Sequence, residues 1–168
     1  MISNKDFSEA TTDQEKYKWI EFYKVVFKAD YYVPLSSNDK LILNARAAFG
    51  YLGFYNPDIG PSPFENFYVG GDGMTGYSFY GRETIALRGY TNGSLTPYNP
   101  KGTAPSGNVY SKITFELRYP ISLNPQATIY ALTFLEAGRA WYSLKEYNPF
   151  KMNPVSYTHL TLPTNREV

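Results

Sequence analysis

The chain of 168 residues has no cysteine and a single histidine, His159. Without cysteine it contains neither a disulfide framework nor a thiolate metal site, and a Cys-His catalytic pair is impossible. His159 lies in a tail that we set apart below, so Ser-His-Asp catalysis and histidine metal ligation are not expected either. Carboxylate pairs are the one catalytic arrangement that stays open. From the residues alone we therefore expect no metal site built from cysteine or histidine.

Strong charge and long apolar runs are also missing. The formal net charge is +1 and 18% of the residues are charged, so no basic excess points to nucleic acid as a partner. No run approaches the ~18 consecutive apolar residues of a membrane-spanning helix, and residues 1–14 are polar rather than a secretion signal. If the protein is exported, we expect its signal upstream. The mean hydropathy of −0.40 argues only against helical spans, because the strands of membrane barrels alternate in polarity.

Aromatic residues are abundant, at 18% of the chain, with 17 Tyr, 11 Phe and 2 Trp. Tyr and Trp combine an apolar ring with a polar tip. Such rings suit the two aromatic girdles of a membrane barrel, and they suit a sugar-binding face equally well. At this point both interpretations stay open.

Four stretches show the two-residue period of a strand, and each is long enough for the ~9–11 residues that a tilted strand needs to cross a bilayer. In the first, Val25 and Phe27 alternate with Lys28 and Asp30, which gives one apolar and one charged face. The fourth is less regular, with Glu136 expected on the polar side. The four stretches are Tyr23–Val33, Leu41–Tyr51, 108–120 and 127–141.

The connections between these stretches differ greatly in length. Residues 34–40 and 120–126 form short turns, whereas Gly53 to Gly107 is a long segment rich in Gly, Pro, Asn and Tyr. Loops beyond ~12–15 residues are usually functional or disordered, and this one is too aromatic to be disordered. Short turns at one end and a long loop at the other are typical of outer-membrane barrels. The sequence thus predicts an all-β fold, a fragment of an antiparallel transmembrane β-barrel with about four strands and a long extracellular loop.

The last residues, Val155 to Val168, break the pattern of the preceding chain. Residues 155–164 read Val-Ser-Tyr-Thr-His-Leu-Thr-Leu-Pro-Thr, which resembles a translated DNA adaptor from sequencing libraries. We therefore expect two parts: residues 1–154 as part of the barrel, and residues 155–168 as a non-native tail that is excluded from fold reasoning.

Three motifs carry a family resemblance. They are the run Pro63-Phe64-Glu65-Asn66-Phe67-Tyr68-Val69-Gly70-Gly71, the run Leu87-Arg88-Gly89-Tyr90, and Phe134-Leu135-Glu136-Ala137-Gly138 with Trp141. In order and spacing they resemble BamA-type outer-membrane protein assembly factors, of the bacterial surface antigen kind. The resemblance covers the chain from about Lys16 to Pro154.

The resemblance implies a functional loop that folds back into the barrel. Its motif would be Leu87, Arg88, Gly89 and Tyr90, and Arg88 would form a lumen salt bridge with Glu136. A guanidinium grips a carboxylate through two charge-assisted hydrogen bonds. The loop anchor would comprise Pro63, Phe64, Asn66, Phe67, Tyr68, Gly70 and Gly71. The alternative for Phe64, Phe67 and Tyr68 is a purely structural plug. The chain departs from the family pattern by having Glu136 where Asp is frequent and by an insertion, Asp72 to Ala86, which leaves the loop path open.

The implied function is the insertion and folding of β-barrel proteins in the Gram-negative outer membrane. Because this is assembly rather than covalent chemistry, the resemblance implies a protein that is not an enzyme, with no catalytic residues, no metal and no cofactor. Its implied partners are nascent outer-membrane proteins, membrane lipid, and assembly-complex lipoproteins reached through periplasmic domains that this chain lacks. Two alternatives remain. One is a related barrel that assembles autotransporters or secretes a partner protein, and the other is a soluble carbohydrate-binding β-sandwich.

Overall fold

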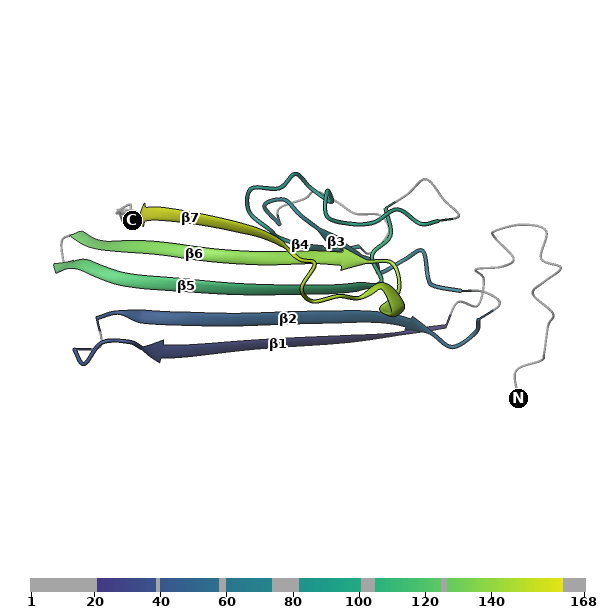
Figure 1. The fold of residues 1–168 in the computed structure, drawn as a ribbon, viewed down its shortest axis with the longest axis horizontal. Helices are drawn as coiled ribbons and strands as arrows, with labels where there is room; N and C mark the ends of the chain where they lie inside the picture. Colours follow the sequence, from purple (N-terminus) through teal and green to yellow (C-terminus); the bar gives the residue numbers. More distant parts are fainter. Residues whose placement is uncertain are drawn as a thin grey trace, which may run out of the picture.

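The computed structural model describes residues 21–38, 40–57, 60–73, 82–100, 105–124 and 127–161. Five long strands form one antiparallel sheet in the order β1-β2-β5-β6-β7 (Figure 1). Two short strands, β3 and β4, pair in parallel beside it. The strands are β1 Phe22–Pro34, β2 Ile42–Phe54, β3 Phe67–Val69, β4 Glu83–Ile85, β5 Val109–Asn124, β6 Ala127–Trp141 and β7 Asn153–Thr161.

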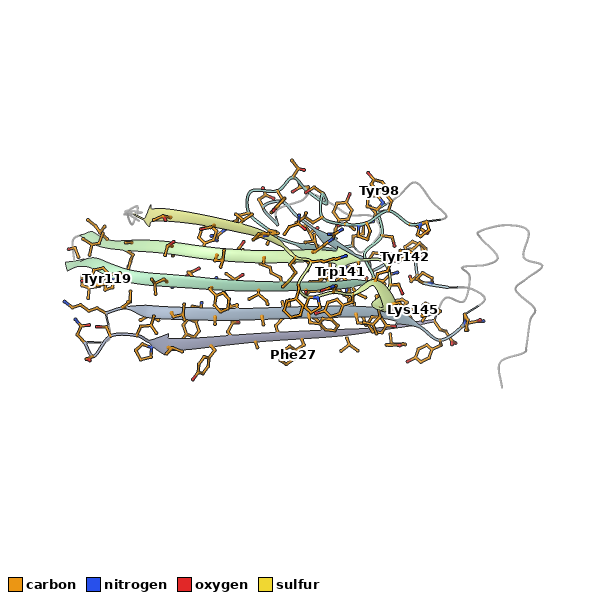
Figure 2. The ribbon with its side chains drawn as sticks, in the orientation of Figure 1. Phe27, Tyr98, Tyr119, Trp141, Tyr142 and Lys145 are labelled. Carbon is orange, nitrogen blue, oxygen red and sulfur yellow. The ribbon has the colours of Figure 1, made fainter. Side chains whose placement is uncertain are left out.

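The sheet has two chemically different faces, as the alternating sequence predicts. Arg46 of β2 lies opposite Asp30 of β1 and Thr114 of β5, so even-numbered residues of these strands share one face, which we call the inner face. The outer face carries apolar side chains in contact with solvent, including Phe27 on β1 (Figure 2), which is 61% exposed, and Phe115, which is 44% exposed. This single layer with one apolar face confirms the predicted barrel-wall fold. A sandwich requires a second sheet packed on the apolar face, and the described residues form none there.

The predicted strand positions agree with the structure, with two extensions. β6 has the predicted bounds, whereas β2 ends at Phe54 rather than Tyr51, and β5 continues past Pro120 to Asn124. Proline has no N–H to donate to a sheet ladder. The pairing with β6 accordingly shifts register between Pro120 and Ser122, and the strand resumes beyond this irregularity.

A fifth long strand was not predicted. β7 pairs antiparallel with β6, from Gly138↔Asn153 to Tyr130↔Thr161, and so includes residues 155–161 of the tail. Pairing at the edge of a sheet depends on main-chain hydrogen bonds, which many sequences can form. Strand formation therefore does not distinguish native residues from adaptor-encoded ones. Residues 162–168 lie outside the described part of the chain.

A small core lies between the inner face and the long connection from β2 to β5. It comprises Leu52, Phe67, Val69, Tyr110 and Ala140, all nearly or fully buried. β3 and β4 belong to this connection and lie at the end of the sheet where it begins and ends (Figure 1). The described residues also include a short 3-10 helix, η2 Leu144–Glu146, and none of their helices is long and apolar enough to cross a membrane.

We expect the isolated chain not to be a stable soluble monomer. Its outer face exposes large apolar side chains such as Tyr31, at 69%, and β1 is an unpaired edge within the described sheet. Exposed apolar faces and open edges promote association. Light scattering in buffer without detergent should detect aggregates, and detergent should disperse them. A monodisperse monomer without detergent would contradict the membrane-wall interpretation.

Candidate functional site

The segment from residue 60 to residue 107, here called the inner loop, folds back against the inner face in its described parts. Main-chain hydrogen bonds tie its layers together: Phe67 N–H donates to Gly107 O at 2.8 Å, and Leu95 N–H donates to Val69 O at 3.2 Å. The Ala140 N–H of β6 donates to Leu95 O at 3.1 Å, which joins the inner loop to the sheet. The position of the loop against the wall is therefore fixed by backbone bonds as well as by side chains.

Phe67 is the buried centre of the predicted anchor. Its side chain is fully buried, with its ring centroid 4.6 Å from that of Tyr110 and 4.9 Å from the Lys24 ammonium. Gly50 leaves the space for this pair, because a Cβ there would lie 2.2 Å from Tyr110 and 2.7 Å from Phe67. Phe64, by contrast, is 41% exposed. The Phe-rich run thus contains one buried plug residue and one surface residue.

Asn66 and the two anchor glycines fix the turns on either side of β3. Asn66 is 2% exposed, and its amide nitrogen can face three main-chain carbonyls, including that of Phe64 at 3.0 Å. Gly70 and Gly71 have φ of +117° and +92°, where side chains are strained. A Cβ on Gly71 would also collide with the Asn92 side chain at 1.6 Å. These positions therefore require the residue types that the sequence has.

The remaining anchor residues have lesser roles. Pro63 is exposed, and Tyr68 is half-buried with its ring against Gly93, where a Cβ would lie 2.0 Å from it. The Arg82 guanidinium lies 5.6 Å from the Tyr68 ring centroid. Tyr68 therefore holds two parts of the inner loop together.

The motif Leu87 to Tyr90 forms a turn that docks on β6 and β7. Leu87 is fully buried, and its N–H donates to Gly71 O at 3.0 Å. Gly89, with φ of +81°, makes the turn. The Tyr90 hydroxyl donates to Pro154 O at 3.1 Å. The motif thus joins the anchor to the wall.

Glu136 lies beneath this turn and is 4% exposed. Its carboxylate contacts three groups: the Lys112 ammonium at 3.4 Å, the Thr114 hydroxyl at 3.4 Å and the main-chain N–H of Arg88 at 3.5 Å. The Arg88 guanidinium lies over the Phe134 ring, 4.5 Å from its centroid. The main chain of Arg88 therefore contacts Glu136, but in the described residues the ion pair of Glu136 is with Lys112 and not with the Arg88 guanidinium. The salt bridge between the Arg88 guanidinium and Glu136 stays a prediction.

Geometry explains why Lys112 takes this place. Lys112 lies opposite Gly138 in the register of β5 and β6, so no side chain separates it from Glu136, two residues away on the same face. Its ammonium also donates to Ala86 O at 2.6 Å, next to the motif. Sequence reasoning missed Lys112. The signal that could have identified it is its position on β5: even-numbered residues of this strand lie on the charged inner face, as Glu136 does on β6.

A second set of charges joins the insertion to β1. The part of Asp72 to Ala86 that the structure describes includes β4, where Glu83 pairs with Lys24 at 3.0 Å and with Lys28 at 3.8 Å. Lys24 also pairs with Glu65 at 3.1 Å. The insertion thus lies along the inner face near β1.

The inner face also holds a charge network between strands and a cavity. Arg46 pairs with Glu116 at 2.9 Å and with Asp30 at 3.8 Å, and Arg118 also pairs with Glu116. A cavity of about 300 Å³ lies between this wall and the inner loop. Its charged lining comprises Lys28, Asp30, Arg46, Asp72, Arg88, Lys112 and Glu136. Among the described residues, no group of three His, Cys, Asp or Glu side chains could hold a metal ion.

The sheet has an apolar outer face, and a loop docks on its charged inner face. Comparison with known proteins identifies the family. The model of the Omp85 superfamily domain matches residues 6–158. This chain belongs to the Omp85 superfamily. Omp85 proteins are outer-membrane proteins of the insertion and secretion type, a family of transport and assembly proteins rather than enzymes. The match ends inside the predicted tail.

The Omp85 fold is also evident from a solved structure. The chain is similar to BamA from Haemophilus ducreyi, in a crystal structure that lacks POTRA domains 1-3, with 21% sequence identity and a TM-score of 0.54. The similarity covers 84% of this chain and 32% of that one. At this identity the likeness shows the fold, and this Omp85 chain spans about a third of the length of the BamA chain.

Proposed function

We propose that this chain is part of a BamA-type assembly factor that inserts and folds β-barrel proteins in the Gram-negative outer membrane. The observation that supports the proposal best is the docking of Leu87 and Arg88 beside the buried Glu136 carboxylate. These are the residues that carry the family resemblance, and the fold brings them together from distant parts of the sequence. The proposed partners are nascent outer-membrane proteins and, through periplasmic domains outside this chain, assembly-complex lipoproteins.

In this function the wall provides backbone templates rather than covalent chemistry. Client strands would pair edge to edge with strands of the assembled barrel, using main-chain hydrogen bonds. The inner loop would stay in the lumen, where Lys112 and the motif turn hold it against Glu136. We propose no catalytic residues and no cofactor.

The test uses the full-length protein in phosphatidylcholine vesicles. A urea-unfolded outer-membrane barrel protein is added, and its folded form is followed by heat-resistant migration on a gel. We expect faster client folding than in empty vesicles. A folded, inserted barrel that fails to accelerate clients but passes a soluble partner across the vesicle wall would favour the secretion alternative.

We also propose that residues 155–168 are adaptor-encoded. Replacing them, in the complete barrel, by the native continuation of β7 should leave barrel folding unchanged or improved, because edge pairing with β6 needs mainly main-chain groups. Heat-resistant migration measures the result. A barrel that folds only with residues 155–168 in place would show that they are native.

A further inference from the structure

The connection between β6 and β7, residues 142–152, folds onto the outer face of the sheet, and we call it the strap. The ring centroid of Tyr147 lies 4.9 Å from that of Trp141 and 5.6 Å from that of Phe49, both with edge-to-face geometry. Phe49 and Trp141 are odd-numbered residues on the face opposite the inner loop. The strap therefore covers the side of the wall that points away from the lumen.

The strap shields part of this face that would otherwise be exposed. Met152 accepts a hydrogen bond from the Ser111 hydroxyl at 3.3 Å, and Ser111 is only 6% exposed. Val109, on the same face of β5, is fully buried, whereas Phe115, farther along that face, is 44% exposed. In an assembled wall, the strap lies between the sheet and its surroundings at the end that carries the long connection.

The outward surface of the strap combines apolar and cationic side chains. Phe150 is 94% exposed and Leu144 is 50% exposed. Lys145 and Lys151 are exposed too, against one exposed acidic residue, Glu146. Figure 2 shows Lys145 at the same end of the sheet as Trp141. None of these three charged residues has an ion pair within the described part of the chain.

We propose that the strap is a lipid-contacting element whose lysines bind the phosphates of anionic lipid headgroups while Phe150 enters the acyl boundary. An almost fully exposed ring beside two ammonium groups is suited to an interface that is apolar on one side and anionic on the other. The strap lies on the same face as Phe27 and Phe115, so a membrane that covers those side chains reaches it as well. This inference rests on the proposed function, because it requires the outer face to be in lipid.

The experiment uses single bimane labels on introduced cysteines, in the full-length barrel with any further cysteine replaced. This part of the protein has no cysteine of its own. Phe150→Cys reports on the strap, and Phe27→Cys reports on the outer face of β1. Barrels are reconstituted in phosphatidylcholine alone or in an equimolar mixture with phosphatidylglycerol. Quenching by nitroxide-labelled lipid then measures how close each label is to the acyl chains.

We expect quenching at residue 150 that increases when phosphatidylglycerol is present. Lys145→Gln with Lys151→Gln should abolish this increase, while Lys40→Gln, a control at the short-turn end, should preserve it. Two results would overturn the strap proposal alone. One is quenching at residue 27 without quenching at residue 150, and the other is a phosphatidylglycerol-dependent increase at residue 150 that persists after both lysines are replaced. If residue 27 in a folded, reconstituted barrel is not quenched, the outer face is not in lipid, and both this inference and the membrane placement in the proposed function are wrong.

Discussion

Replacing Glu136 with alanine is expected to destabilise the full-length barrel strongly. The substitution leaves the Lys112 ammonium, with a side chain only 19% exposed, without its carboxylate partner at 3.4 Å. Removing one partner of a buried ion pair costs up to ~3–5 kcal/mol, and somewhat less where water reaches the remaining charge. The inner loop also loses the acceptor for the Arg88 N–H. Heat-resistant migration on a gel and client assembly should both decrease.

Glu146→Ala is the control, because the Glu146 carboxylate is exposed. It should change the free energy of unfolding by less than about 0.5 kcal/mol.

A double-mutant cycle distinguishes the two cations near Glu136. The coupling of Lys112→Met with Glu136→Gln should exceed that of Arg88→Met with Glu136→Gln, because the Arg88 guanidinium packs on Phe134 instead. Lys112→Glu with Glu136→Lys should be more stable than either reversed charge alone. If the coupling free energies of Lys112 and Arg88 with Glu136 are equal, the Arg88 guanidinium binds the Glu136 carboxylate in the assembled barrel, as the family resemblance implies.

Replacing Phe67 with alanine is expected to release the inner loop from the wall. The ring is fully buried against Tyr110, and Gly50 provides no side chain to fill the space left behind. Truncating a buried Phe to Ala costs about 3–5 kcal/mol. Limited proteolysis of the full-length barrel should therefore cut the inner loop much faster, because the free energy needed to undock it decreases.

Phe64→Ala is the matched control, since Phe64 belongs to the same run as Phe67 but is 41% exposed. It should change proteolysis little. If the wall strands are stable without the docked loop, heat-resistant migration of Phe67→Ala persists while proteolysis increases. Equal proteolysis of the two variants would mean that Phe67 does not anchor the loop.

The sequence predicted the wall because strand periodicity and face polarity coincide in it. Val25 and Phe27 alternate with Lys28 and Asp30, and a one-residue slip in register would move the charges to the apolar face. Because such a slip is energetically unfavourable, the faces of these strands can be predicted from the sequence alone. β7 was missed because most of its residues, 155–161, were set aside as a non-native tail, although an edge strand can form with little demand on its side chains.

The sequence also identified most residues around the site through family motifs, but not how they touch. Glu136, Leu87 and Phe67 are buried where the loop meets the wall. Lys112 belongs to no motif, and its contact with Glu136 depends on the register that places it opposite Gly138. The sequence placed the turn between these strands at residues 120–126, whereas β5 runs to Asn124 and shifts register between Pro120 and Ser122, so counting from the predicted turn does not give this pairing.

By itself, then, the sequence determined the long strands, their two faces and the long loop, because each follows from local alternation or from the spacing of turns. Only the tertiary structure decided which cation pairs with Glu136, that Glu83 ties the insertion to β1, and that the strap covers the outer face. Each of these contacts joins residues far apart in the chain. Their meeting depends on strand register and on the reach of single side chains, and neither leaves a periodic signal in the sequence.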